Sequence, residues 1–112
     1  MTYDILLAGR IRSILDGTPN LTEKQMFAGL AFLINGNMAA AVSGQGGIVV
    51  RTDPKRSLAL AAETPAQIME MRGKPMPGWM RVESGYVQSD DELTKWVHMG
   101  VAYAASLPPK KP

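Results

Sequence analysis

The segment from residue 26 to residue 42 constrains the fold more than any other part of the chain. Two apolar runs, residues 26–34 and 38–42, flank the dipeptide Asn35-Gly36. A tight two-residue hairpin turn needs positive φ angles, and Asn and Gly adopt these more readily than other residues do. The segment therefore predicts a β-hairpin and, with it, an antiparallel sheet.

The length of 112 residues is typical of a single domain, so we expect one domain over 1–112 that ends in a short Pro/Lys tail at 107–112. The chain has no cysteine, which excludes disulfides and thiolate nucleophiles. No apolar run approaches the roughly 20 residues that span a bilayer. The first residues lack the charged and apolar regions of a signal peptide. These observations favour a cytoplasmic protein that does not bind membranes.

Hydrophobic periodicity and turn residues predict the other elements. Helices are expected over residues 3–16, over residues 53–63, and from Ser89 to the stop at Leu107-Pro108-Pro109. Strands are expected over residues 22–34, 37–42, 47–52, 67–71 and 79–83. Residues 72–78 are expected to form a loop, because two prolines interrupt a simple strand ladder. The predicted fold is a two-layer α+β domain, an antiparallel five-stranded sheet packed with helices in the order α-β-β-β-α-β-β-α.

The first predicted helix has Thr2 as its cap and one buried stripe. The stripe consists of Tyr3, Leu7, Ile11, Ile14 and Leu15. Ile5 and Leu6 lie off this stripe. They belong either to a wider core face or to a surface that meets another chain, and the core interpretation is favoured.

Residues suited to catalysis or metal binding are scarce. A catalytic triad would have to use His98, the only histidine, which lies within the last predicted helix. Its position beside the apolar stripe favours a boundary side chain with one edge in solvent. Asp90, Asp91 and Glu92 are consecutive and suit the positive end of a helix better than a metal site. The sequence therefore predicts no enzyme activity, no cofactor and no metal.

Basic residues near the second predicted helix form a candidate contact for an anion or a nucleic acid. They are Arg51, Lys55, Arg56, Arg72 and Lys74. A helix start with cations beside it can attract phosphate. The formal net charge of the chain is only +2, so simple solvated side chains are the favoured interpretation.

Eight methionines are many for 112 residues. Met69, Met71, Met76, Met80 and Met99 either fill the core, which is the favoured interpretation, or form an adaptable binding surface. Trp79 lies between two of them and favours an exposed apolar patch. The candidate interface residues are Ile5, Leu6, Met76, Trp79 and Met80.

Several motifs resemble the N-terminal domain of the TfoX/Sxy family, bacterial proteins known as competence regulators. They are Tyr3-Asp4, residues 22–32 with Met26, Phe27 and Gly29, the Asn35-Gly36 turn with Asn37-Met38, residues 73–79, Trp96-Val97 and residues 106–109. Ala28 stands where the family usually has the first glycine of Met-Phe-Gly-Gly. We interpret Met26, Phe27, Gly29, Asn35 and Gly36 as structural, with Met26, Phe27 and Phe32 in the core.

The resemblance implies an α+β fold and a stand-alone N-terminal module, without the second helical domain of the competence regulators. It supplies no catalytic residues. The functional expectation is a non-catalytic cytoplasmic regulatory or protein-interaction module, with a role related to transcriptional regulation and a protein partner or a second copy in a homodimer. The alternative is an accessory nucleic-acid-binding protein that uses the basic residues around the second helix.

Overall fold

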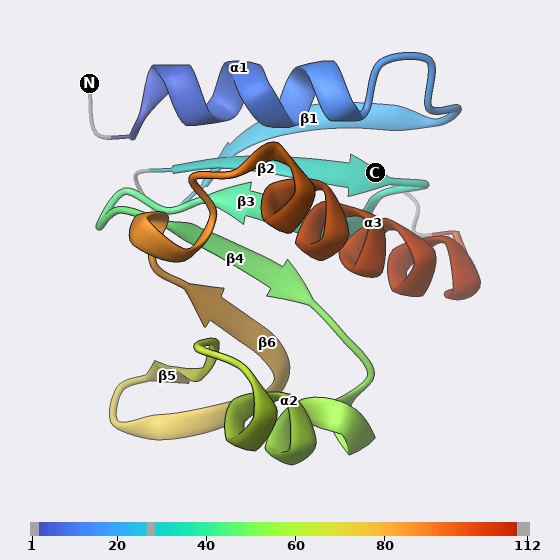
Figure 1. The fold of residues 1–112 in the computed structure, drawn as a ribbon. Coiled ribbons are helices and arrows are strands. Elements are labelled where there is room, and N and C mark those ends of the chain that lie inside the picture. Colours follow the sequence, from blue (N-terminus) through green and yellow to red (C-terminus); the bar gives the residue numbers. More distant parts are fainter. Residues whose placement is uncertain (1–2, 27–28, 110–112) are drawn as a thin grey trace.

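A computed structural model describes residues 3–26 and 29–109, and its elements are labelled in Figure 1. The helices are α1 (Ile5–Ile14), α2 (Ser57–Glu63) and α3 (Asp90–Ser106), with short 3₁₀ turns η1 (Pro54–Arg56) and η2 (Ser84–Tyr86). The strands are β1 (Leu21–Met26), β2 (Gly29–Ile34), β3 (Asn37–Val42), β4 (Ile48–Arg51), β5 (Gln67–Met71) and β6 (Lys74–Val82).

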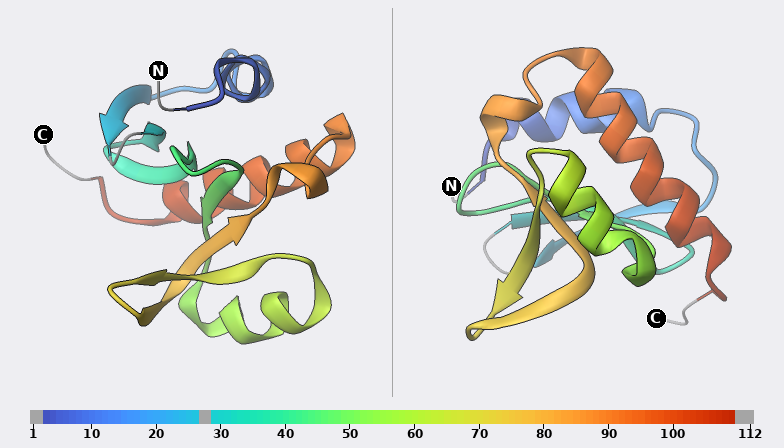
Figure 2. Two further views of the ribbon diagram at one scale, coloured as in Figure 1. Left: turned by 90° about the vertical axis from the view of Figure 1, so that its left-hand side faces the viewer. Right: turned by 60° about the horizontal axis from the view of Figure 1, so that its bottom comes forward.

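The described strands form one six-stranded antiparallel sheet in the order β1-β2-β3-β4-β6-β5. Strands β1 to β4 follow one another along the sheet. The chain then passes through α2, and β6 inserts between β4 and β5. Figure 2 shows that the β5–β6 hairpin and α2 form an arm that projects from the part of the sheet beside α1 and α3. The α+β class is confirmed, but the sheet has six strands rather than five, so the predicted element order is wrong.

The main core lies between the sheet and the helices α1 and α3. Helix α1 contributes Leu7 and Ile11 to this core together with Leu15, its C-cap, and α3 contributes Leu93, Trp96 and Val97. The sheet contributes alternate residues, which include Leu30, Phe32, Val42, Ile48, Val50, Met80 and Val82. Because neighbouring residues in a strand point to opposite faces, the residues between these point away from both helices.

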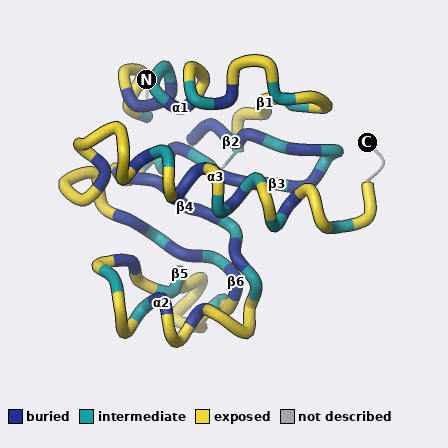
Figure 3. Tube along the Cα trace, turned by 45° about the vertical axis from the view of Figure 1, so that its right-hand side comes forward, coloured by how far each residue is buried: buried dark blue, intermediate teal, exposed yellow. Residues whose placement is uncertain are grey.

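The predicted long strand over residues 22–34 is instead the hairpin of β1 and β2, in which Met26 pairs with Gly29. The two halves differ in burial: β1 is exposed along its centre, whereas β2 is almost wholly buried (Figure 3). This difference fits an edge strand beside a central one. Gly29 lies at a close backbone approach, because a Cβ there would lie 2.2 Å from the Val42 carbonyl oxygen.

The Asn35-Gly36 turn is confirmed, with φ angles of 54° and 82°. In the adjacent β2–β3 pair, the register shifts so that Phe32 pairs with Ala40 and Leu33 with Met38. The shift leaves Ala39 as an extra residue, a β-bulge. Helix α3 packs on this bulge through Gly100, where a Cβ would lie 2.2 Å from the Ala39 carbonyl oxygen.

Helix α1 starts two residues later than predicted. Asp4, not Thr2, is its N-cap, because the Asp4 carboxylate accepts a hydrogen bond from the Leu7 N–H. Ile5 and Leu6 are 57% and 82% exposed, so the core interpretation of these two residues is wrong. The predicted stripe holds better, since Leu7, Ile11 and Leu15 are buried and Tyr3 and Ile14 are partly buried.

The predicted loop over residues 72–78 is largely strand, since β6 begins at Lys74. Pro75 and Pro77 lie before Trp79, where the pairing of β6 with β4 begins, so neither has to donate a hydrogen bond to β4. The β5–β6 register shifts between Ile68 and Glu70, which leaves residues 76–79 of β6 in a bulge. Gly78 lies within this bulge with a φ of 92°. The start of α3 was predicted correctly, because the Ser89 hydroxyl accepts a hydrogen bond from the Glu92 N–H.

We predict opposite effects of alanine at two helical glycines. Gly100→Ala lowers the free energy of unfolding by roughly 1–3 kcal/mol, because the methyl group collides with the β3 backbone. Gly9→Ala in α1 meets no atom within 4 Å and raises the free energy of unfolding by about 0.5–1 kcal/mol through helix propensity. Urea denaturation of both variants measures this difference, and equal effects would contradict the packing described here.

We also predict that the stabilisation of the fold by the Arg12–Glu23 ion pair, which joins α1 to β1, depends on pH. Hydrogen bonds from Arg12, at 2.7 and 2.8 Å, lower the pKa of the Glu23 carboxyl below its usual range. Glu23 therefore stabilises the fold above the unfolded carboxyl pKa of about 4.3, and this contribution is lost as pH falls through the lower folded pKa. Glu23→Gln should be less stable than wild type at neutral pH and equally stable in acid. Glu83→Gln, on an exposed residue without an ion pair among the described residues, is the control in thermal unfolding.

Candidate binding groove

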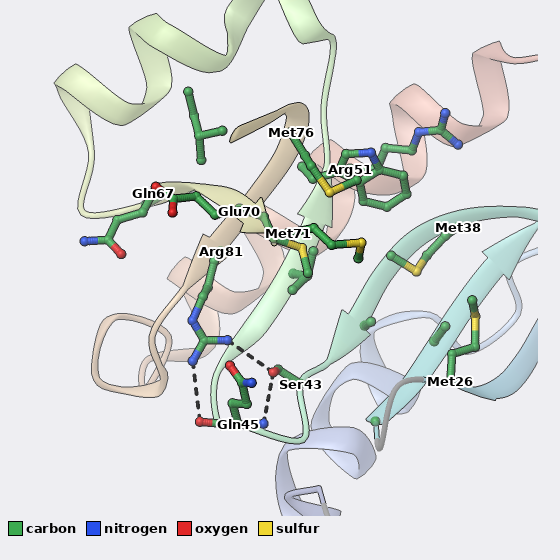
Figure 4. Close-up of a pocket in the computed structure, with 18 of the residues that line it drawn as sticks. Met26, Met38, Ser43, Gln45, Arg51, Gln67, Glu70, Met71, Met76 and Arg81 are labelled. Atoms are coloured by element: carbon green, nitrogen blue, oxygen red, sulfur yellow. Dashed lines mark hydrogen bonds between the residues drawn. The ribbon is translucent and has the colours of Figure 1, made fainter. Parts of the chain in front are cut away.

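The sheet face that points away from α1 and α3 lines a groove of about 1310 Å³. One wall is formed by β1, β2 and β3, the floor by β4 and β6, and the other wall by the β5–β6 hairpin with residues at the end of α2 (Figure 4). We call this surface the methionine groove, because Met26, Met38, Met69, Met71 and Met76 all line it.

Strand alternation and two bulges explain why these side chains share one face. Ala31 and Leu33 of β2, and Val49 and Arg51 of β4, alternate with core residues and line the groove. Bulged Ala39 resets the alternation of β3, so that Met38 and Ala41, three residues apart, both line the groove. The β6 bulge lets Met76 line the same groove as Trp79 and Arg81.

The methionines divide between the core and the groove. Met80 is fully buried, and Met99 packs against the core from α3, which confirms the core interpretation for these two. Met69, Met71 and Met76 line the groove instead, so the core interpretation is wrong for them. Met26 was expected in the core, yet it also lies partly buried at the groove. Phe27 lies outside the described residues, and Phe32 is in the core as predicted.

Three arginines line the groove. The Arg51 guanidinium lies 4.9 Å from the centre of the Trp79 ring, its cross-strand partner, and 5.8 Å from that of Tyr103 on α3. Arg81 donates hydrogen bonds to the Ser43 hydroxyl and the Gln45 carbonyl, at 3.1 and 3.4 Å. Arg72 lies in the β5–β6 turn with a φ of 55°.

The structure separates the five basic residues that were predicted to contact an anion or nucleic acid. Arg51 and Arg72 line the groove, whereas Lys55 and Arg56 are exposed on η1 and Lys74 is exposed at the start of β6. At η1, the Asp53 carboxylate already accepts a hydrogen bond from the Lys55 N–H, which adds negative charge where an anion was expected. Nucleic-acid binding by this set stays a prediction.

The candidate interface residues lie in three different places: the groove, helix α1 and the core. Met76 and Trp79 line the groove, and Ile5 and Leu6 are exposed on α1, on the other side of the sheet (Figure 1). Met80 is fully buried and presents no surface to a partner.

Sequence reasoning missed Arg81 and Val49. Their shared face is detectable only once β4 is paired with β6, where Val49 lies opposite Arg81.

His98 is exposed on α3, as expected for a boundary histidine. Within residues 3–26 and 29–109, no group of three or more His, Cys, Asp or Glu side chains is arranged to hold a metal ion. None of the described helices is both long and apolar enough to cross a membrane.

A family model described as the TfoX N-terminal domain matches residues 13–104. The chain belongs to this family. The match covers both walls and the floor of the groove, together with α2 and most of α3 of this TfoX N-terminal domain. A comparison with curated protein sequences finds no match.

The arm of the TfoX N-terminal domain that carries Met69, Met71 and Met76 is fastened by buried hydrogen bonds at Gly78. The Gly78 N–H donates to the Ser57 hydroxyl at 2.6 Å, and the Gly78 carbonyl accepts from the Thr52 N–H at 2.7 Å. Ser57 is 1% exposed. The Thr52 hydroxyl oxygen is buried nearby without a hydrogen-bond partner among the described residues.

We predict that the Ser57 and Thr52 hydroxyl groups contribute differently to the free energy of unfolding. Ser57→Ala leaves the buried Gly78 N–H unpaired and lowers the free energy of unfolding by about 1–3 kcal/mol. Thr52→Val removes a hydroxyl that bonds to nothing, keeps the side-chain shape, and changes stability by less than about 0.5 kcal/mol or increases it. Chemical denaturation of both variants measures the difference, and an equal loss would refute the assignment of the Ser57 bond.

Proposed function

We propose that this TfoX N-terminal domain is a non-catalytic protein-interaction module, with a regulatory role in the cytoplasm, and that the methionine groove is its binding surface. The observation that supports the proposal most strongly is the gathering of five methionines from four strands on one open face. Unbranched, polarisable methionine side chains adapt their shape to a partner.

The exposure of the groove residues supports the same proposal. Met71 is 41% exposed, and Met26, Met38, Met69, Met76 and Trp79 are all partly exposed. Removal of apolar surface from water is favourable by about 25 cal/mol for every Å² that a partner covers. A contiguous apolar face of this kind is typical of an interaction site.

We predict that a photo-crosslinking amino acid in place of Met71 forms discrete covalent adducts with a protein in cells. The same amino acid in place of Leu58, which is 78% exposed on α2 and does not line the groove, is the matched control and should form none of these adducts. Gel mobility and mass spectrometry of the adducts measure the outcome. An adduct of twice the chain mass identifies a homodimer.

Two outcomes would contradict the proposed interaction site. The first is the absence of protein adducts from position 71 while the variant folds normally. The second is an identical set of adducts from positions 71 and 58, which would indicate contact without a defined binding surface.

A further inference from the structure

The charges of the methionine groove identify the kind of protein segment that it fits. Among the described residues that line the groove, three are cationic, Arg51, Arg72 and Arg81, and Glu70 is the only carboxylate. The apolar surface is thus bordered by a surplus of positive charge. The inference drawn from this surplus rests on the proposed interaction function of the groove.

The groove arginines have no carboxylate partners within the described part of the chain. The ion pairs there are Arg10–Asp90, at 3.2 Å, and Arg12–Glu23, at 2.7 Å, and both involve α1. The groups that hold Arg81 are neutral, the Ser43 hydroxyl and the Gln45 carbonyl. Arg51 is held by the Trp79 and Tyr103 rings.

These contacts orient the guanidinium groups and leave their charge uncompensated. A guanidinium carries five N–H donors, and the hydrogen bonds described above use only two of those of Arg81. The flat fork of Arg matches the two oxygens of a carboxylate. Figure 4 shows Arg51 beside Met76 at one end of the groove and Arg81 beside Ser43 and Gln45 at the other, with Met71 between them and Met38 across from Met71.

The volume of the groove is comparable with that of one short helix. Because an α-helix is about 10 Å wide and rises about 1.5 Å per residue, a groove of about 1310 Å³ holds roughly three turns of helix. An amphipathic helix that docks in a groove uses apolar anchors at positions i, i+3, i+4 and i+7. The geometry points to a partner protein that inserts an acidic amphipathic helix, with its apolar stripe on the methionines and its Asp or Glu side chains on Arg51, Arg72 and Arg81.

A peptide selection tests this assignment. The full chain is immobilised and used to select from a random peptide library of about 16 residues, long enough for roughly four helical turns. The double variant Arg72→Gln/Arg81→Gln serves for counter-selection. The expected peptides are rich in Asp and Glu and have apolar residues at helical spacing.

Affinity measurements on the selected peptides use a control of equal charge. Arg72→Gln/Arg81→Gln should weaken binding by roughly tenfold or more, with a loss of salt dependence. Lys55→Gln/Arg56→Gln removes the same two charges from η1, outside the groove, and should change affinity by less than about twofold. Thermal unfolding checks that both double variants fold.

Neutral or basic selected peptides would overturn the assignment, as would peptides that bind both double variants equally. Tighter binding of a single-stranded DNA of similar length, lost in Arg72→Gln/Arg81→Gln, would favour the nucleic-acid alternative instead. If position 71 crosslinks to a second copy, or to a partner without an acidic helix, the acidic-helix assignment fails while the proposed interaction function stands. If position 71 crosslinks to nothing, the interaction function itself fails.

Discussion

The close contact between α3 and the bulge of β3 determines the arrangement of the rest of the molecule. At Gly100 there is room for a hydrogen and no more, since a Cβ would lie 2.2 Å from the Ala39 carbonyl oxygen. This contact brings α3 directly onto the centre of the sheet and buries Trp96 and Val97 there. The bulge that receives the helix also turns Met38 to the opposite face. The same contact region thus completes the core on one face of the sheet and places Met38 in the groove on the other face.

The two faces of the sheet differ because the described helices do not share them equally. Helices α1 and α3 pack on one face, and α2 lies on the projecting arm (Figure 2). An open sheet face normally carries polar side chains, yet here β2 and β3 present the partly exposed Leu33, Met38 and Ala41. This apolar composition is the reason that the proposed interaction site is placed on this face.

Local turn and cap chemistry made much of the fold predictable from sequence. Asn35-Gly36 and Ser89 each specify a backbone geometry through their own side chains or through a positive φ, so their prediction was correct. The β1–β2 hairpin was missed because residues 26–29 contain no Asn-Gly or Asp-Gly turn signal. The change from exposed β1 to buried β2 marks that boundary. The excessive length of a 13-residue strand was a second usable signal.

The groove was harder to predict, because it depends on pairing between distant strands. Alternation alone would place Met38 and Ala41 on opposite faces, and only the register shift at Ala39 brings them together. The same holds for Met76, which the β6 bulge directs toward the groove. The two prolines that argued against a strand lie before Trp79, where β6 pairs with β5 but not with β4.

The arginines show the same division between the two sides of the molecule. On α1, Arg10 and Arg12 reach carboxylates of other elements and tie the helix to its neighbours. On the groove side, Arg51 and Arg81 are held by neutral groups instead: rings for Arg51, and a hydroxyl and a carbonyl for Arg81. Internal ion pairs would serve stability equally well or better if stability were the only demand on these side chains. Fixing a cation through neutral contacts keeps its full charge available beside an apolar surface.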